Sequence, residues 1–324
     1  THVAGTVGVG RTNNNSGVAG VNWNVKVLPL RVLGKCGGTM VDINDAIRWA
    51  AGIHVDGVPD NSNPAKVINM SLGGSMPCSN SPATQNAINE VVARGVTVVV
   101  AAGNEAQDVA NVVPGGCDNV IAVAASDRSG NLVTRYSNYG AKVDILAPGG
   151  DVITDSDNDG NPDGVLSMVQ GGYAFYNGTS MAAPHVAGVA ALMLANNSAL
   201  SPAEVEQGIK IGALPRSSSQ CTKPCGAGLL DAKVAIATSL PDQYSLTVSP
   251  GSVSLEEGDK TNISALLKQN NTPAANKTVV LSSSNPAVAT VSPQNATTGT
   301  NGETAAQIMA LKPGTAAITL THET

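Results

Sequence analysis

Three short stretches of this chain carry the residue types that a hydrolytic site needs. Ser180 precedes a long apolar run that predicts a buried helix. In the first turn of a helix, unpaired backbone N–H groups and the helix dipole can hold a developing oxyanion. His2 is the kind of base that activates a serine, and Asn104, at the end of an apolar run, can donate its side-chain amide to the same oxyanion. A serine that only caps its helix is the simpler alternative for Ser180 taken alone.

The three stretches together resemble the motifs of the subtilisin-like serine peptidases, the subtilase family. They read Thr-His-Val-Ala-Gly-Thr at residues 1–6, Ala-Ala-Gly-Asn-Glu at 101–105 and Asn-Gly-Thr-Ser-Met-Ala-Ala-Pro-His at 177–185. They occur in the family's order, and the resemblance extends to about residue 237. It implies that Ser180 is the nucleophile, His2 the base and Asn104 the oxyanion donor of an enzyme that acts on polypeptides without an organic cofactor.

By the same resemblance, three segments bind the substrate. Their residues are Leu33 and Gly34, then Ser71, Leu72 and Gly73, and finally Ala101, Ala102 and Gly103. The first segment edges the cleft and pairs with the substrate backbone as an added strand, and the second forms the opposite wall. The third lines the primary specificity pocket. Glu105 follows that pocket and leaves two alternatives, a preference for Lys or Arg before the scissile bond or a solvated side chain.

The catalytic triad of the family also contains an aspartate, in an Asp-Ser-Gly or Asp-Thr-Gly motif that precedes the histidine. Neither motif occurs in this sequence, which begins one residue before His2. We expect the aspartate to lie in a natural segment upstream of Thr1, with a signal and a propeptide before it. A natural chain that lacks the aspartate is the alternative. Residues 1–324 alone are therefore expected to be poorly folded or nearly inactive.

Length and charge limit the class of protein. The chain has 324 residues, enough for two domains, and its net charge of −6 argues against nucleic acid or an anionic membrane surface as a partner. No apolar run reaches the roughly 18 residues that would cross a membrane. The acidic stretch at 155–164 contains Asp155, Asp157, Asp159 and Asp163 around Gly160. Alternating carboxylates predict a structural Ca²⁺ site, with a soluble acidic loop as the alternative.

Apolar runs alternate with amphipathic stretches through residues 1–237. This pattern predicts an α/β fold, a subtilisin-like parallel sheet with helices on both faces, whose ligands bind at the carboxyl ends of the strands. We expect strands at 25–32, 67–72, 96–100, 120–125 and 143–148. Helices are expected at 3–10 and 42–51, from 82, along the run that ends at 194, from 202, and at 231–237.

The pattern changes after a linker at 238–243. Apolar and polar residues alternate in short runs around Leu246, Ile263, Val279, Ile308 and Ile318, with turn residues between them. Such runs predict an all-β sandwich for residues 244–324. The ending Lys-Pro-Gly-Thr-Ala-Ala-Ile-Thr-Leu-Thr resembles bacterial Ig-like domains, which implies a spacer, or a module that contacts a cell surface or the substrate.

Five cysteines suggest disulfides and hence an oxidising compartment. Cys221 and Cys225 are close enough in sequence for a local disulfide. From the family's neighbouring strand ends we expect Cys36 to pair with Cys78, which leaves Cys117 without a partner. A set of reduced, buried thiols is the alternative.

The sequence as a whole predicts a secreted, monomeric serine endopeptidase followed by an Ig-like domain. A non-catalytic cell-surface or adhesive protein on a degenerate scaffold is the second hypothesis. A lipase or esterase is disfavoured, because Gly178-Thr-Ser180-Met-Ala182 does not form the Gly-x-Ser-x-Gly elbow.

Overall fold

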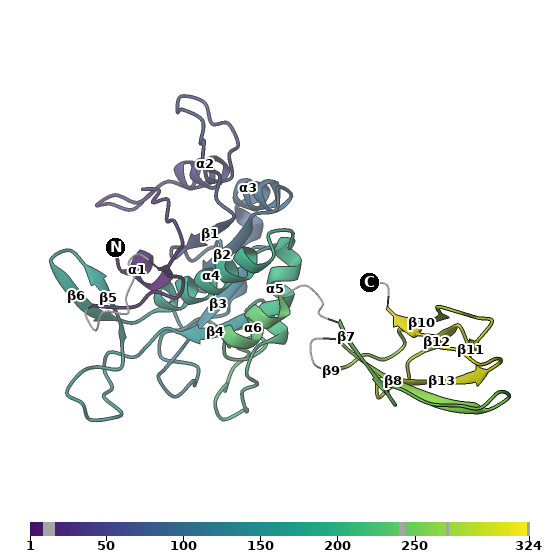
Figure 1. Cartoon of the computed structure of the whole chain (residues 1–324). Coiled ribbons are helices and arrows are strands. Elements are labelled where there is room, and N and C mark those ends of the chain that lie inside the picture. The colour runs from purple at the N-terminus through teal and green to yellow at the C-terminus, as the bar shows by residue number, and fades with distance from the viewer. Residues whose placement is uncertain (9–16, 240–243, 270–271, 323–324) are drawn as a thin grey trace. The chain divides into compact units, whose positions relative to one another are not determined.

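Four apolar runs of the sequence form a parallel sheet in the computed structural model of the chain (Figure 1). The strands are β1 Val67–Met70, β2 Thr97–Ala101, β3 Ile121–Ser126 and β4 Ile145–Pro148, in sequence order across the sheet. β2 and β3 are buried along their whole length, as continuous apolar runs predict. The structure describes residues 1–8, 17–239, 244–269 and 272–322, which divide between two units, Thr1–Leu240 and Pro241–Thr324.

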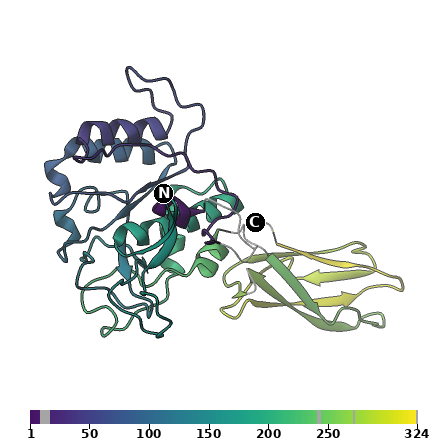
Figure 2. The same ribbon diagram turned by 90° about the vertical axis from the view of Figure 1, so that its left-hand side faces the viewer.

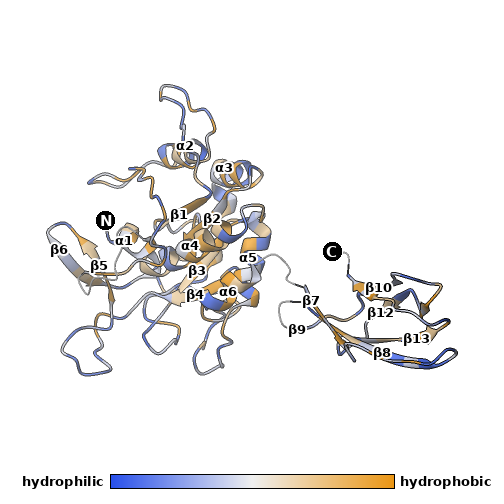
Figure 3. Ribbon diagram, viewed as in Figure 1, coloured by the Kyte–Doolittle hydropathy of each residue, from blue (hydrophilic) through white to orange (hydrophobic). Residues whose placement is uncertain are grey.

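Helices cover both faces of this sheet, as predicted, and each face has its own apolar core. One face carries α4 Thr179–Asn196, α5 Pro202–Ile211 and α6 Ala232–Thr238. The other carries α2 Met40–Ala50 and α3 Pro82–Val92, which lie side by side in Figure 2. Figure 3 shows that apolar residues are concentrated in the four strands and in α4. Among the described residues, no helix is both long and apolar enough to cross a bilayer.

The helix starts follow from local capping. Ser201 and Glu204 form a reciprocal cap of α5, in which the Ser201 Oγ accepts the Glu204 N–H at 3.3 Å and Glu204 Oε2 accepts the Ser201 N–H at 2.8 Å. Thr39 caps α2 through the Asp42 N–H, so this helix begins two residues before the predicted start. α1 is shorter than predicted and spans His2–Val7, while residues 9 and 10 of the predicted helix lie outside the described residues.

The predicted strand at 25–32 is wrong. This segment has no ladder partner within the described part of the chain, and β1 forms the edge of the sheet beside it. Val27 and Leu28 are accordingly 37% and 42% exposed. A cavity of about 160 Å³ separates the segment from β1 and α2, with Leu28, Val32 and Met70 among its lining residues. Apolar β-branched residues favour a strand, but only a neighbouring backbone completes one.

The predicted cysteine pairing is also wrong in part. Cys78 pairs with Cys117, Cys221 pairs with Cys225 as predicted, and Cys36 is a free, exposed thiol. The reason lies in the loops after β1 and η2 (Val109–Asn111), because Gly74 and Val113 bridge each other as antiparallel backbone. That bridge brings the Cα atoms of Cys78 and Cys117 to 5.1 Å, and Cys78 begins the short helix η1 (Cys78–Asn80).

An antiparallel hairpin, which the sequence did not reveal, follows the acidic loop. It consists of β5 Val165–Val169 and β6 Gly172–Tyr176, and it ends directly before α4. β6 therefore places Tyr176 four residues before Ser180.

The second unit is an all-β sandwich, as predicted. One sheet runs β11-β13-β8-β7, with β9 paired to β8, and the other runs β12-β10-β14. Figure 1 shows β8 and β13 in one layer and β10 and β12 in the other. The strands are β7 Tyr244–Ser249, β8 Lys260–Gln269, β9 Thr272–Pro273, β10 Thr278–Ser283, β11 Ala289–Ser292, β12 Asn295–Thr297, β13 Glu303–Ala310 and β14 Ile318–Thr321. Alternate residues such as Ile263 and Leu267 face the shared core. Residues 240–243 of the expected linker lie outside the described residues.

Candidate active site

Ser180 lies in the first turn of α4, at the carboxyl end of the sheet. Gly178 caps this helix with φ of +147°, a conformation that side chains rarely adopt. The Ser180 Oγ donates to the Ser71 carbonyl at 3.3 Å, and the Ser71 Oγ donates to the Ser180 carbonyl at 2.8 Å. The Ser180 carbonyl is available because Pro184, four residues on, has no N–H to bond it. Ser180 is thus fixed to the end of β1 as well as to its own helix.

Asn104 lies directly against the residue before the serine. Its Oδ1 accepts hydrogen bonds from the Thr179 N–H at 2.8 Å and from the Thr179 Oγ1 at 3.1 Å. The Thr179 Oγ1 in turn accepts the Gly103 N–H at 3.1 Å. These bonds occupy the oxygen of the Asn104 amide, so its Nδ2 hydrogens remain as donors at an exposed position beside Ser180. This is the donor that an oxyanion between the two residues requires.

The structure joins two of the three predicted cleft segments to these residues. Ser71 contacts Ser180, and Gly103 contacts Thr179, through the hydrogen bonds just given. Leu72 and Gly73 continue the first of these segments, and Ala101 and Ala102 precede Gly103 at the end of β2. Leu33 and Gly34 lie on a separate exposed turn, where Gly34 bonds Gly37. Within the described residues no hydrogen bond connects that turn with the other two segments.

Asn138 is a residue of this region that sequence reasoning missed. Its side chain is fully buried and bonds the loop that carries Asn104. Nothing in the sequence Ser-Asn-Tyr-Gly at 137–140 indicates a contact with residues more than thirty positions earlier.

His2 begins α1 and is buried against the β5–β6 hairpin. Its Nε2 lies 3.0 Å from the Val165 carbonyl and 3.1 Å from the Ala174 carbonyl, so the hydrogen is on Nε2 and is donated there. The imidazole stacks on the Tyr176 ring, with centroids 4.5 Å apart and planes at 10°. Its Nδ1 is buried and has no hydrogen-bond partner among the described residues. In the described structure His2 is not hydrogen-bonded to Ser180, the serine that it was predicted to activate.

A second histidine, His185, lies one turn after Ser180 on α4. Its Nδ1 donates to the Met181 carbonyl at 2.9 Å. Burial lowers the pKa of His185, the bond to Met181 opposes this shift, and the charge of a protonated His2 lowers the pKa further. The His185 Nδ1 is therefore engaged with its own helix.

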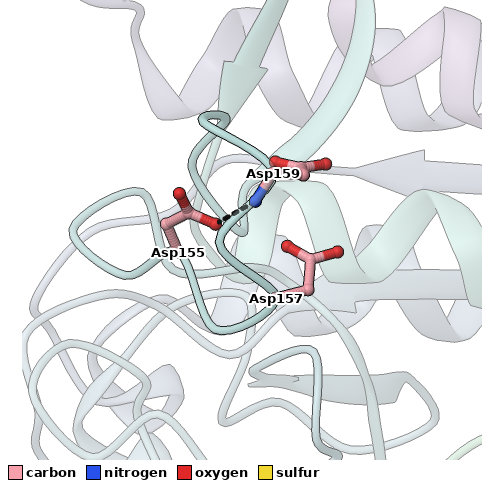
Figure 4. A group of neighbouring side chains, drawn as sticks. All are labelled: Asp155, Asp157 and Asp159. Atoms are coloured by element: carbon pink, nitrogen blue, oxygen red, sulfur yellow. Dashed lines mark hydrogen bonds between the residues drawn. The ribbon is translucent and has the colours of Figure 1, made fainter.

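The acidic loop brings together three of the four predicted metal ligands, as Figure 4 shows. Asp155, Asp157 and Asp159 are exposed, and one oxygen of each lies within 4.8 Å of the others. Asp155 also accepts the Asp159 N–H at 3.2 Å and the Gly160 N–H at 3.1 Å, which closes the loop. That spacing suits an ion such as Ca²⁺, whose oxygen ligands lie at about 2.3–2.6 Å.

The fourth predicted ligand, Asp163, lies outside that group. It is buried and accepts hydrogen bonds from the Ser156 N–H, at 2.8 Å, and from the Ser156 hydroxyl. These bonds hold the pKa of Asp163 below its ordinary value. Arg128 joins the two sets, because its guanidinium contacts Asp157 at 2.6 Å and Asp163 at 3.4 Å. A cation at the loop would therefore share Asp157 with Arg128.

Comparison with known proteins assigns a likeness to each unit. Residues 1–228 match the Subtilase family, and residues 244–324 match the bacterial Ig-like domain, group 2. The chain is 50% identical over 243 residues to an extracellular protease of Xanthomonas campestris pv. campestris, and 44% identical over 247 residues to an extracellular basic protease of Dichelobacter nodosus. These alignments cover 74% and 75% of this chain but only 40% and 39% of the two curated relatives.

A solved structure shows the same likeness. The chain superposes on a protease from Pseudoalteromonas arctica with a TM-score of 0.67 and 50% sequence identity, over 74% of this chain and 70% of that one. A cold-adapted subtilisin-like serine proteinase is 32% identical, with a TM-score of 0.56, over 72% of this chain and 73% of that one.

Proposed function

Because the chain belongs to the subtilase family, we propose that it forms the catalytic part of a secreted serine endopeptidase that hydrolyses peptide bonds in polypeptides. The observation that carries this proposal is the contact of Asn104 with Thr179, directly beside Ser180. Secretion is supported by relatives named as extracellular proteases and by the two disulfides.

Ser180, His2 and Asn104 take the three roles in the reaction. The Ser180 Oγ attacks the peptide carbonyl carbon while the hydroxyl proton passes to His2. This attack produces a tetrahedral intermediate whose former carbonyl oxygen carries the negative charge. Asn104 Nδ2 and the Ser180 backbone N–H donate to that oxygen. The C–N bond then breaks as His2 returns the proton to the leaving amine, and water repeats the sequence to release the acyl group from Ser180.

The base is the part of the site that needs a further group. In the arrangement described above, His2 Nε2 donates to the hairpin carbonyls, so it cannot accept the serine proton without turning. We assign the missing constraint to an aspartate upstream of Thr1. The buried, unpartnered His2 Nδ1 supports this assignment, because a carboxylate there fixes the tautomer and orientation of the imidazole. Among the described residues β1 is an edge strand, so its unpaired side could bond the strand that would carry this aspartate.

The remaining parts follow from the same premise. Leu33 and Gly34, Ser71–Gly73 and Ala101–Gly103 pair with or enclose the substrate. We assign residues 1–237 to the peptidase domain, 238–243 to a linker and 244–324 to an Ig-like module that contacts a surface or the substrate, in a monomeric protein. Glu105 is bonded to Asn104 and Asn138, which disfavours a role for its carboxylate in selecting basic side chains.

We further propose that Asp155, Asp157 and Asp159 hold a structural Ca²⁺, which would offset the repulsion between their carboxylates. Titration of Ca²⁺, with Mg²⁺ as the control ion, is expected to raise the melting temperature of the whole protein. Asp155→Asn should remove the increase, and Asp56→Asn, on another loop, should keep it. Because Arg128 competes for Asp157, Arg128→Gln should lower the Ca²⁺ concentration needed. Equal effects of Ca²⁺ on the wild type and on Asp155→Asn would contradict the site.

Labelling with a fluorophosphonate, read by intact mass, tests the proposed enzyme activity. The whole natural protein is expected to gain one adduct, and Ser180→Ala none, because only an activated serine attacks phosphorus at neutral pH. No adduct on a folded wild-type protein would favour the second hypothesis, a non-catalytic surface or adhesive protein.

A further inference from the structure

The loop that carries Asn104 is folded around one buried amide, that of Asn138. Asn138 Nδ2 donates to the Ala102 carbonyl and to Glu105 Oε2, both at 2.8 Å. Its Oδ1 accepts the N–H groups of Glu105 and Gln107, both at 3.0 Å. The two donors and two acceptor positions of the amide are all used, and the side chain has no exposed surface.

The backbone on both sides is shaped to allow this contact. The Asn138 N–H donates to the Gly103 carbonyl at 3.0 Å, and the Ala106 N–H donates to the Tyr136 carbonyl at 2.8 Å. Gly103 has φ of +105°, and a side chain there would lie 2.2 Å from Asn138 Nδ2. Glycine at 103 and asparagine at 138 are therefore required together.

The contact reaches Asn104 through Glu105. The carboxylate oxygen that accepts the Asn138 amide also accepts the Asn104 N–H, at 2.9 Å. The backbone of Asn104 is thus held by Glu105, while its side-chain oxygen is held by Thr179. Because the backbone N–H and the side-chain oxygen of Asn104 are both hydrogen-bonded, the orientation of its Nδ2 is set before the substrate binds.

We propose that Asn138 is a positioning residue that aims the oxyanion donor Asn104, acting through Glu105 and the loop 102–107. This inference rests on the proposed role of Asn104 in catalysis. Its physical basis is preorganisation: a donor stabilises the developing charge fully only when it needs no rearrangement. A displacement of about 1 Å in such a group can cost about 10²-fold in rate.

A purely structural role for Asn138 makes a different prediction, which a double-mutant cycle on the whole active protein separates. Asn104→Ala is expected to lower kcat by about 10²–10³-fold, with KM nearly unchanged. Asn138→Ala should lower kcat by about 10-fold to 10²-fold in the wild type but by less than about threefold in the Asn104→Ala background, because its target is then gone. Rates are normalised to active sites titrated with the fluorophosphonate.

Glu105 supplies the second arm of the test, because its side chain is exposed and its replacement leaves no cavity in the core. Glu105→Ala should lower kcat by about 10-fold, since it frees the Asn104 backbone, and this loss should also shrink in the Asn104→Ala background. Glu105→Gln retains an oxygen that can accept both N–H groups and should keep most of the activity.

The outcomes separate cleanly. Losses for Asn138→Ala and Asn104→Ala that multiply in the double variant would overturn the proposal and leave Asn138 as a structural residue. If Asn138→Ala does not fold, the Glu105 cycle decides in the same way. If Asn104→Ala itself keeps full kcat, the oxyanion role of Asn104 fails first and the proposal with it. Retained Ser180 labelling would then show that the serine is still activated.

Discussion

The two sides of the candidate site are held in different ways. On the side of the oxyanion donor, Asn104, Thr179 and Ser180 are joined to one another and to the end of β1 by hydrogen bonds within the chain. On the side of the base, His2 is held by backbone carbonyls of a hairpin, and its Nδ1 has no partner among the described residues.

The difference shows which part of the site these residues can build by themselves. The oxyanion side needs only groups that pack on the parallel sheet, and its bonds fix it without any outside partner. An imidazole has two nitrogens, and its orientation depends on what each one bonds. Nδ1 has no hydrogen-bond partner in the part of the chain that the structure describes, and Nε2 bonds the carbonyls of Val165 and Ala174. Four predictions test this contrast.

The largest effect is expected from restoring the partner of His2. Residues 1–324 alone should have a kcat at least about 10⁴-fold below that of the whole natural protein, because the imidazole lacks the group that fixes its tautomer. Hydrolysis of a fluorogenic peptide, with Ser180→Ala subtracted as background, measures the ratio. Equal activity of the two proteins would show that His2 turns toward Ser180 without an upstream aspartate. The side of the base would then be as self-sufficient as the oxyanion side.

The second prediction concerns the covalent support of the oxyanion side. The Cys78–Cys117 disulfide spans a sequence separation of 39, and Gly115, next to it, lies against the carbonyls of Ala101 and Ala102. Cys78→Ser with Cys117→Ser should lower the free energy of unfolding by about 2–4 kcal/mol, because the unfolded chain gains freedom. Denaturant unfolding measures it, and Cys36→Ser, which removes only a free thiol, is the control. An unchanged free energy of unfolding would mean that the bridge at Gly74 and Val113 suffices.

The third prediction weakens the oxyanion side by a single hydroxyl. Thr179→Val keeps the shape of the buried side chain but removes its bonds with Asn104 and Gly103. The kcat should fall by about fivefold, the equivalent of one hydrogen bond of about 1 kcal/mol, with KM little changed. Thr179→Ser should retain most of the activity. If both variants match the wild type, the Thr179 backbone N–H alone holds Asn104.

The smallest effect is expected on the side of the base, from His185. Its pKa in the folded protein lies below the value of 6.5 for a free histidine, chiefly because of burial. The neutral form is therefore favoured by folding, and this contribution is complete above about pH 6.5 and is lost as the pH falls through the lower folded value. His185→Asn should flatten the decrease in melting temperature between pH 7 and pH 5. Identical slopes for the two proteins would show that His185 does not titrate in this range.

The sequence predicted those parts of the fold that depend on local pattern. Continuous apolar runs indicated β2 and β3, and the position of Asn104 after one such run placed it at the carboxyl end of the sheet. Features that depend on a distant partner were missed. The segment 25–32 has the composition of a strand but no neighbour, and the partner of Cys78 was decided by the bridge between Gly74 and Val113.

Asn138 and Asp163 illustrate the same limit for the functional residues. The four bonds of Asn138 go mostly to backbone groups, which every residue has, so no pattern of side chains could reveal them. Asp163 fits the alternating carboxylates of the acidic loop, yet the Ser156 hydroxyl and N–H engage it instead.

Pro184 has a consequence for anyone who would transplant this nucleophile into another protein. By removing one bond of α4, it frees the carbonyl of Ser180, which then takes its hydrogen bond from the Ser71 hydroxyl at the edge of the sheet. The position of Ser180 is thus fixed by a hydrogen bond to the end of a strand as well as by its own helix. A graft of α4 alone would carry the serine but lose the hydrogen bond from Ser71 that positions it. The unit to transfer is therefore the proline, the serine and the strand end together.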